Sequence, residues 1–575
     1  MNISSPYRTA KGVVRQSRVR LAELLPGSAD LVAVGRDPRR DLIAGLTVAI
    51  VALPLALAFG VASGLGAQAG LATAVVAGIV AAVFGGSNLQ ISGPTGAMAV
   101  VLVPVVHQYG PSGVLMVGSI AGLVLIASAI AGVGQYMRYL PVSVIEGFTA
   151  GIAVVIVLQQ VPAALGIANP SGEKVWAIAA DAVGHYVRDP HVAPPVVALS
   201  VAALMLGGAR WRPGVPFSLL GIAAVTLLAR LFDLGLAPLG HLPASLPAPS
   251  LGFVDLGAIG ALMMSAFAVA ALAGLESLLC ATVADGMSVG EQHDPDRELF
   301  GQGLANVVVP MFGGVPATAA IARTAVNVRA GARSRLAAVS HSMILLGVIF
   351  AAAPLVSDIP LAALAGVLFA TCVRMVEAGS LRTLIRATRA DALIVILTFT
   401  VTVAVDLVTA VGVGVGVAVV LALRAVARSA RLDKVPLEAG DHTAEEHALL
   451  SEHIVAYRLD GPLFFAAAHR LLIELTDVTD VQVVILRMSR ITTMDATGAH
   501  VLGDAITKLE HRGITVILSG ITPGHDDVLA LLGIADQLRA DGLIFPDTPT
   551  AITHARSLLT KTTTSQHDAT HPRPK

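Results

Sequence analysis

The sequence holds few of the residues that soluble proteins use most. Only 13% of its 575 residues are charged and only 4% are aromatic, whereas a soluble domain carries about 25% charged residues. Its 2 cysteines are too few for a disulfide scaffold or a multi-cysteine metal site. A formal net charge of −1 gives no basic surplus for nucleic acid. These shortages argue against an ordinary soluble enzyme, a disulfide-rich secreted domain and a nucleic-acid-binding protein.

Apolar residues are what the chain has in quantity. They make up 55% of it, and the mean hydropathy is +0.77. Since a membrane-spanning helix needs about 20 apolar residues, the runs between about Leu42 and Leu423 predict a polytopic α-helical protein of the cell membrane, with the lipid bilayer as a partner. The fourteen predicted segments are 42–60, 68–84, 92–106, 113–133, 141–164, 194–208, 215–233, 258–283, 298–313, 317–328, 336–355, 360–373, 391–406 and 408–423.

Positive charges alternate between the predicted loops. If the N-terminus is cytoplasmic, every second loop should be rich in Lys and Arg. The predicted inner loops hold eleven arginines, whereas the outer loops hold only Lys174 and Arg188, with Arg230 near an outer segment end as an exception. Because one missed segment would reverse the pattern downstream, it predicts an even number of crossings with both termini cytoplasmic.

Changes in composition divide the chain into five regions. We expect a basic cytoplasmic segment without a cleavable signal at 1–40, a transmembrane domain at 41–430, an acidic linker at 431–450, an α/β domain at 451–561 and a disordered tail at 562–575. Within the α/β region, strand-like runs alternate with helix-length stretches, at 455–459, 466–477, 481–488, 496–511 and 514–519.

Two short stretches of the membrane region match each other. Residues 84–97 and 312–320 each contain Phe-Gly-Gly, a proline, a threonine and a run of small residues that opens a short helix. Pro94 and Pro316 lie 222 residues apart, close to the 216 that separate the first segments of the two halves. Since each half has seven segments, an odd number, the halves should be inverted in the membrane. Such Gly/Pro-interrupted pairs indicate the substrate site of an inverted-repeat transporter.

The matched stretches predict an anion site. A helix that begins inside the membrane leaves its first N–H groups unpaired, and these groups and the helix dipole favour an anion. Pro94 and Pro316 suit first-turn positions because they bring no N–H, and glycine lets the backbone approach a ligand closely. The residues predicted to bind substrate are Gly93, Pro94, Thr95, Gly96, Ala97, Ala317, Thr318, Ala319 and Arg323.

Arg323 and Glu276 place charges inside apolar segments. Arg323 is expected on the second turn of the short tenth segment, where it either faces the anion or snorkels to the membrane surface. Glu276 lies far from both ends of the eighth segment, and a carboxylate there is costly unless it is paired or protonated. We predict that Glu276 carries a proton reversibly; the alternative is a structural ion pair, with Arg323 as a candidate partner.

At these residues the sequence resembles the SulP family, the sulfate permeases. The C-terminal region resembles the STAS domain that follows the membrane part of SulP proteins, and the resemblance spans roughly residues 36–560. The stretches that carry it are 53–60, 274–279, 283–287, Asn306, 313–318, 322–327, 458–466 and 494–498.

The resemblance implies a fold of seven-plus-seven inverted repeats with core and gate subdomains. It also implies a substrate between helices three and ten, an elevator-like motion and a homodimer, with Glu276 and Arg323 in the places of the family's helix-eight carboxylate and helix-ten arginine. Sodium-coupled bicarbonate members have hydroxyl residues where Cys280 and Ile321 stand, and neither side chain offers the oxygen that Na⁺ prefers. Regulatory STAS relatives phosphorylate a serine where Ala496 stands, so we expect a dimerisation or docking role instead.

The predicted function is secondary active transport of a small anion, sulfate or a similar oxyanion, coupled to protons. An anion exchanger and a bicarbonate or dicarboxylate carrier stay open, and an uncoupled anion channel or a STAS-based membrane signalling protein is less favoured. No Walker or HExxH pattern and no hydrolytic nucleophile–base pair stands out, so neither an enzymatic activity nor a cofactor or metal is expected.

Overall fold

The computed structural model describes residues 24–27, 37–137, 141–168, 170–172, 174–212, 215–288, 292–405, 407–429, 431–434, 453–463 and 481–569. The chain divides into two compact units, Met1–Val415 and Gly416–Lys575. Most of the predicted N-terminal segment and linker, and the whole helix predicted at 466–477, lie outside the described residues.

The first unit is built almost entirely from helices. They are α3 (Pro38–Ala62), α4 (Ala67–Phe84), α5 (Gly96–Ile130), α6 (Gly134–Met137), α7 (Val142–Leu165), α8 (Val175–Arg188), α9 (Ala193–Trp211), α10 (Phe217–Phe232), α11 (Ile259–Met287), α12 (Pro295–Val308), α13 (Ile321–Arg329), α14 (Leu336–Ser357), α15 (Leu361–Met375), α16 (Ala378–Ala387), α17 (Arg389–Ala404) and α18 (Leu407–Ser429), the last of which continues into the second unit. Two short strands, β1 (Ser92–Gly93) and β2 (Thr318–Ala319), and the 3₁₀ turns η1 (Leu256–Ala258) and η2 (Val309–Phe312) lie between them.

The helical membrane fold is confirmed. Each of the fourteen predicted segments overlaps a helix, and eight helical stretches among the described residues are long and apolar enough to cross a membrane. The third and fourth segments both lie in α5, which is interrupted at Gly110 (φ 66°, ψ −172°) just before Pro111. Helices α6, α8 and α16 have no counterpart among the predicted segments, because they are short or amphipathic and a search for apolar runs does not find such helices.

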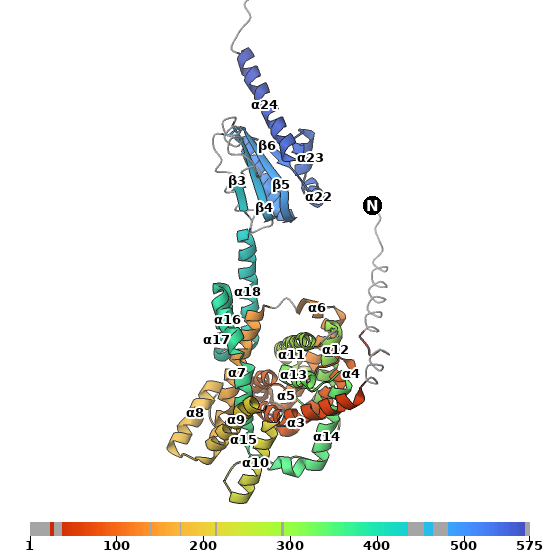
Figure 1. Cartoon of the computed structure of the whole chain (residues 1–575), viewed down its shortest axis with the longest axis vertical. Coiled ribbons are helices and arrows are strands. Elements are labelled where there is room, and N and C mark those ends of the chain that lie inside the picture. Colours follow the sequence, from red (N-terminus) through yellow and green to blue (C-terminus); the bar gives the residue numbers. More distant parts are fainter. Residues whose placement is uncertain are drawn as a thin grey trace, which may run out of the picture. The chain divides into compact units, whose positions relative to one another are not determined.

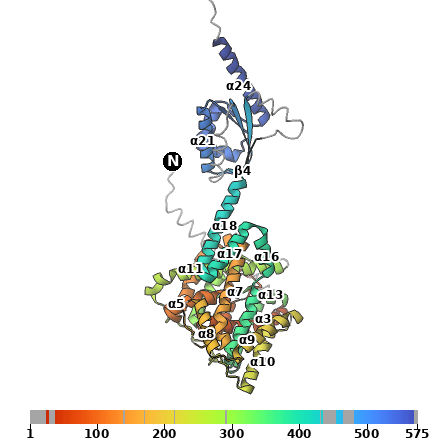
Figure 2. The same ribbon diagram turned by 90° about the vertical axis from the view of Figure 1, so that its left-hand side faces the viewer.

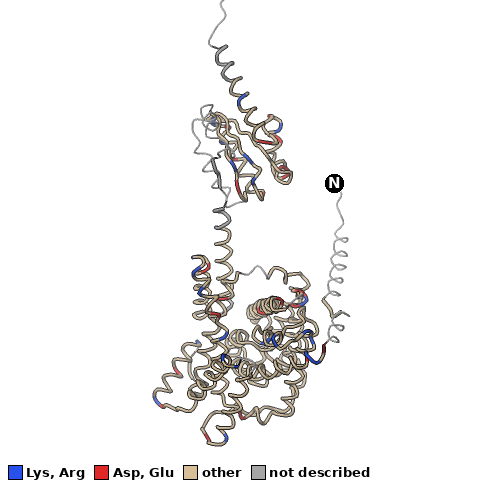
Figure 3. The backbone as a smooth tube through the Cα atoms, in the orientation of Figure 1, with Lys and Arg blue, Asp and Glu red and all other residues tan. Residues whose placement is uncertain are grey.

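Helices of the first unit pack as two groups (Figure 1). We call α3, α4, α5, α11, α12, α13 and α14 the core group, and α7, α9, α10, α15 and α17 the gate group. Glycines permit the close contacts: a Cβ on Gly122 of α5 would lie 2.6 Å from the carbonyl oxygen of Gly303 in α12. Charged residues of this unit gather mostly near helix ends, with long uncharged stretches between them (Figure 3).

The second unit is an α/β domain around a five-stranded sheet of order β3-β4-β5-β6-β7. Strand β3 (Arg431–Lys434) is antiparallel to β4 (Ile454–Leu463), and β4, β5 (Val483–Met494), β6 (Thr515–Ser519) and β7 (Ile544–Phe545) are mutually parallel. Helices α21 (Ala496–His511), α22 (Pro523–Leu531), α23 (Ile534–Ala540) and α24 (Thr548–Ala569) pack against this sheet (Figure 2). Of the predicted elements, 455–459, 481–488 and 514–519 fall on β4, β5 and β6, and 496–511 is α21.

Two expected boundaries differ in the structure. Strand β3 lies at the start of the predicted linker and pairs with β4, so these four residues belong to the sheet. Helix α24 continues to Ala569, into the region predicted as a disordered tail. No glycine or proline interrupts the chain between Pro549 and Pro572, so nothing in the sequence breaks the helix at residue 562.

Candidate anion site

The two repeated stretches meet in the structure. Strand β1 pairs with β2 in antiparallel fashion, with Ser92 opposite Ala319 and Gly93 opposite Thr318. The first strand leads into α5 and the second into α13, so two helices start at the two ends of one short strand pair. Stretches 222 residues apart therefore form a single structural feature, and they enter it from opposite directions, as an inverted repeat requires.

The start of α5 is capped by Thr95. Its Oγ1 accepts a 3.5 Å hydrogen bond from the backbone N–H of Met98 and donates to Oε2 of Glu276 at 3.0 Å. Pro94 precedes this cap, and Pro316 precedes β2, so the expectation of prolines in the first helical turn is wrong. A proline favours extended backbone in the residue before it. Here Pro94 follows β1 and Pro316 lies just before β2, so neither proline opens a helix.

The start of α13 has no side-chain cap. Its N-cap residue is Ala320, whose methyl group cannot accept a hydrogen bond from the first turn. Ala320 is half-buried and Ile321 is 46% exposed, so this helix start borders accessible space. Uncapped N–H groups at an accessible helix start can bind an anion.

Arg323 is fully buried beside β1. It lies in the first turn of α13, not the second as predicted, because the helix begins at Ile321 instead of 317. Its Nη2 donates to the carbonyl oxygen of Pro94 at 2.9 Å, while Nη1 finds no hydrogen-bond partner among the described residues. A Cβ on Gly93 would lie 2.7 Å from Nη1, so only glycine leaves room there. A guanidinium that is 1% exposed does not snorkel.

Glu276 lies near the start of α5 and is only half-buried. Its described hydrogen bond is the one from Thr95, and it forms no ion pair with Arg323, whose charged group points to Pro94. The structural ion pair considered above is therefore absent here. A carboxyl group in mid-helix with one hydroxyl donor and partial accessibility has room to take up a proton.

Thr318 is turned away from accessible space. Its hydroxyl, 0% exposed, donates to the carbonyl oxygen of Ala273 at 3.2 Å and lies 2.9 Å from the hydroxyl of Ser277. Ser277 in turn accepts a hydrogen bond from the backbone N–H of Ala319 at 3.2 Å. These contacts hold β2 against α11. The other predicted site residues, Gly93, Pro94, Thr95, Gly96, Ala97, Ala317 and Ala319, are also brought together at the strand pair, and all are buried.

Polar residues of α13 bind the segment that leads to α5, which we call the arm (residues 86–95). The side chain of Asn327 donates to the carbonyl oxygen of Leu89 at 2.8 Å. The hydroxyl of Thr324 accepts from the N–H of Ile91 at 3.0 Å, and Arg323 donates to the carbonyl oxygen of Pro94 as described. Helix α13 and the arm thus form one unit, which fixes the two helix starts relative to each other.

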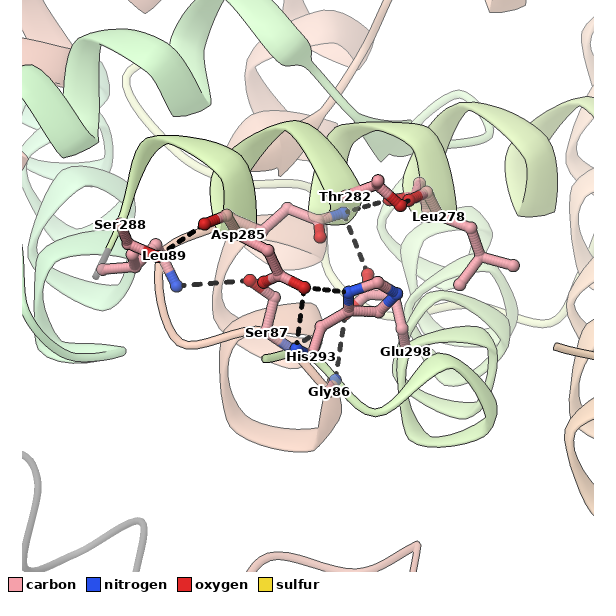
Figure 4. A network of polar contacts seen from close by, with 11 residues as sticks. Gly86, Ser87, Leu89, Leu278, Thr282, Asp285, Ser288, His293 and Glu298 are labelled. Atoms are coloured by element: carbon pink, nitrogen blue, oxygen red, sulfur yellow. Dashed lines mark hydrogen bonds and ion pairs between the residues drawn. The ribbon is translucent and has the colours of Figure 1, made fainter. Parts of the chain in front are cut away.

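Glu298 of α12 holds the arm from another side and has no counterpart in the sequence prediction. It is 2% exposed. Its Oε2 accepts from the N–H groups of Gly86 (2.9 Å) and Ser87 (3.3 Å), and its Oε1 accepts from the side-chain amides of Gln90 (2.9 Å) and Gln302 (3.0 Å). Figure 4 shows Glu298 within this network, close to an Asp285–His293 contact of 2.7 Å.

Further contacts from α12 complete the support. Gln302 donates to the hydroxyl of Ser92 in β1 at 2.5 Å. Asn306, which the family motifs include, accepts from the N–H of Ala317 at 2.8 Å and donates to that residue's carbonyl oxygen at 2.9 Å. Both strands of the pair are thus fixed by side chains of one helix.

The carboxyl groups of Glu298 and Glu276 have different surroundings. Glu298 accepts four N–H donors, which hold its carboxyl group in place. Glu276 accepts one hydroxyl and is partly accessible. Glu298 therefore supports the arm through many contacts, whereas Glu276 has few contacts and lies beside accessible space.

Comparisons with known proteins identify the family and the fold. The family model described as the sulfate permease family matches residues 39–398, and the STAS domain model matches residues 448–551. The chain belongs to the sulfate permease family. It is 34% identical over 512 residues to the putative sulfate transporter YvdB of Bacillus subtilis, with 87% of this chain and 94% of that protein covered.

Two further similarities bear on the fold and the family. The chain is 33% identical over 504 residues to the bicarbonate transporter BicA of Synechocystis sp., with 85% of this chain and 89% of that protein covered. The solved structure of SLC26A9 matches with a TM-score of 0.75 over 90% of both chains at 16% identity, a likeness that shows the fold. This sulfate permease family member is a multi-pass membrane transporter of anions and not an enzyme.

Proposed function

We propose that the chain is a secondary active transporter that moves a small oxyanion together with protons. The anion binds where α5 and α13 start, and Arg323 supplies the positive charge. Glu276 takes up and releases the coupling proton. The observation that carries this proposal is the pairing of β1 with β2, which places two helix starts, a buried guanidinium and a half-buried carboxyl group together.

Sulfate is the first candidate substrate and bicarbonate the second. Backbone N–H groups and a guanidinium suit a small oxyanion in general, so the site chemistry alone does not choose between them. YvdB is described as a putative sulfate transporter, and BicA as a bicarbonate transporter at nearly the same identity. Dicarboxylates and an exchange mode are further alternatives that the transport assay separates.

Protons are favoured over Na⁺ as the coupling ion. The thiol of Cys280 donates to Thr324 Oγ1 at 3.1 Å, and Ile321 presents a hydrocarbon side chain at the start of α13. Neither supplies the oxygen ligand that a hard cation needs. Glu276, in contrast, can exchange a proton within reach of the proposed anion site.

We also propose the cell membrane as the location, with both termini cytoplasmic. Loops expected on the same side do contact each other: Asp41 accepts from Ser334 on the expected inner side, and Arg230 pairs with Asp358 at 2.6 Å on the expected outer side. The outer ion pair gives the exceptional Arg230 a partner. The homodimer that the resemblance implies stays a prediction.

Uptake into proteoliposomes tests the proposal. Labelled sulfate, bicarbonate and fumarate would each be tested under three separate conditions. These are an alkaline lumen, no pH gradient, and no pH gradient with unlabelled anion inside. We expect one small oxyanion, sulfate first, to accumulate only under the pH gradient, and empty liposomes to serve as the control. Uptake that needs internal anion favours an exchanger, downhill flux alone favours a channel, and no flux of any anion favours a signalling role.

A further inference from the structure

Helix α8 carries an exposed apolar stripe that the transport site does not use. Trp176, Ala180, Val183 and Val187 follow one another at spacings of four, three and four, so they share one face of the helix. The exposed fractions of Trp176, Val183 and Val187 are 55%, 46% and 73%. A different face, with Ala179 and Ala182 buried, belongs to the side packed on α7.

The opposite face of α8 is polar and charged. It presents Lys174, Asp181, His185 and Arg188, at spacings of seven, four and three. The N–H and hydroxyl of Ser171 donate to Asp181 Oδ2 at 2.8 and 2.9 Å, and these hydrogen bonds lower the pKa of Asp181 below its usual value. Asp181 is therefore ionised at neutral pH, and this face belongs in water.

The position of α8 in the chain places it at the end of two membrane helices. It follows the C-terminus of α7 and precedes the N-terminus of α9, and both of those helices have the length and composition of membrane spans. Val192 and Val196, at the beginning of α9, are 66% and 56% exposed, so exposed apolar residues continue from α8 to the start of a helix with the composition of a membrane span. Figure 1 shows α8 at the margin of the gate group.

We propose that α8 lies in the water–lipid interface, with its Trp176 stripe inserted among the lipids and its Asp181 face in water. Amphipathic helices with a tryptophan on the apolar face bind at this depth, where the ring meets both headgroups and acyl chains. A second copy of the chain fits the stripe poorly, because a specific protein interface buries about 800 Å² per partner and the stripe contains four side chains, one of them alanine. Since α8 packs on α7, it attaches the gate group to the membrane surface.

Tryptophan fluorescence tests this directly, because the chain contains only 2 tryptophans, Trp176 and Trp211. The variant Trp211→Phe, full-length and reconstituted in phosphatidylcholine vesicles, reports on Trp176 alone. We expect strong quenching by lipids brominated near the headgroup, weaker quenching by lipids brominated near the acyl-chain end, and little quenching by aqueous iodide. The matched control is His185→Trp in a Trp176→Phe, Trp211→Phe background, which puts the probe on the polar face and should reverse the pattern.

Two results would overturn the proposal. Quenching of Trp176 by iodide but not by brominated lipid would show that the stripe faces water. Protection from both quenchers would show that protein covers it, and disulfide cross-linking through Val187→Cys would then identify a second copy. If both single-tryptophan proteins aggregate on size-exclusion chromatography, the unchanged protein is compared with the single variant Trp176→Phe. The difference between their fluorescence signals is the signal of Trp176, and the same quenching criteria apply to it.

Discussion

Arg323 combines complete burial with an unused hydrogen-bond donor. Nη2 binds the arm at Pro94, whereas Nη1 has no described partner and lies 2.7 Å from where a Cβ on Gly93 would be. Leaving a buried charged donor unpaired is costly, and hydrogen bonds to charged groups contribute about 1.5–3 kcal/mol. A bound oxyanion would supply an acceptor for this N–H group, which supports the proposed binding role of Arg323.

Replacing Arg323 with Ala should weaken anion binding roughly 10- to 100-fold, from the loss of about 1.5–3 kcal/mol of charge-assisted hydrogen bonding. Equilibrium binding of labelled sulfate to the purified variant measures it. Arg323→Lys is the matched control: it keeps the charge but loses the planar fork, so it should recover part of the affinity. Unchanged affinity in Arg323→Ala, with only the yield reduced, contradicts a binding role.

Gly96, the first residue of α5, lies where helices of the core group meet α7 of the gate group. A Cβ there would lie 3.1 Å from Phe59 of α3 and would overlap Ile156 of α7. We expect Gly96→Val to abolish transport while the protein remains folded, since overpacking costs about 1–3 kcal/mol. Gly207→Val is the control, because a Cβ on Gly207 meets nothing within 4 Å. Normal uptake by Gly96→Val at normal expression would remove Gly96 from the site.

The sequence alone identifies the charged residues of the proposed site, but it does not identify the residues that hold the arm in place. Arg323 and Glu276 stand out because a charge inside a membrane segment is costly. Glu298 and Gln302 do not, since polar residues near a segment end are common. Only the folded chain brings Glu298 to Gly86, 212 residues away in sequence.

At the scale of elements, the arm (residues 86–95) is the part on which the site depends. It is held by α13 through Arg323, Thr324 and Asn327, and by α12 through Glu298. The sequence predicted helices starting at 92 and 317, but they start at Gly96 and Ile321 because the preceding residues pair as strands. A strand of two residues has no alternation to detect, so the pairing could not be seen in the sequence.

Removing the Glu298 carboxyl group, which holds the arm from α12, should reduce anion binding without changing proton coupling. Glu298→Ala leaves four N–H donors without their acceptor, and each buried unsatisfied group costs about 1–3 kcal/mol. We expect a lower melting temperature and at least 10-fold weaker sulfate binding. Glu298→Gln keeps the size and one acceptor oxygen, so it should be intermediate in both measurements.

The pH dependence of uptake shows whether Glu298 only holds the arm or itself carries the coupling proton. We expect Glu298 to support the arm and not to carry the coupling proton, so the profile of Glu298→Gln should keep the shape found for the unchanged protein while its amplitude falls. A profile that becomes flat would mean that Glu298 itself exchanges protons, and the roles given to the two carboxyl groups would have to be reversed.

At the scale of the whole molecule, the two units divide the work. Both strands of the site, Arg323 and Glu276 lie in the first unit, and the STAS domain match begins at residue 448. Because β3 belongs to the sheet, a clean deletion removes 431–575 and not only the region after the linker. We expect the truncated protein to show lower yield or slower transport but unchanged sulfate affinity. A truncated protein that is monodisperse and binds no anion would contradict this division.

Coupling to protons is a property of the complete transport cycle, and Glu276 is the residue through which we expect it to act. In the ionised form it repels an incoming anion, and the anion makes ionisation less favourable. Proton and anion should therefore assist each other's binding, and linkage makes the assistance reciprocal. Transport should accelerate as the external pH falls, and Na⁺ should be dispensable.

Glu276→Gln imitates the permanently protonated state. Its amide keeps an oxygen that can accept the 3.0 Å hydrogen bond from Thr95, so the variant should still bind sulfate and exchange it across the membrane within a few-fold of the normal rate. It should lose accumulation driven by a pH gradient, because no proton is released in each cycle. Counterflow and gradient-driven uptake in the same proteoliposomes measure the two activities side by side. If the variant still concentrates sulfate when only a pH gradient is supplied, another group carries the proton; if uptake requires Na⁺ at every pH, the inference from Cys280 and Ile321 is wrong as well.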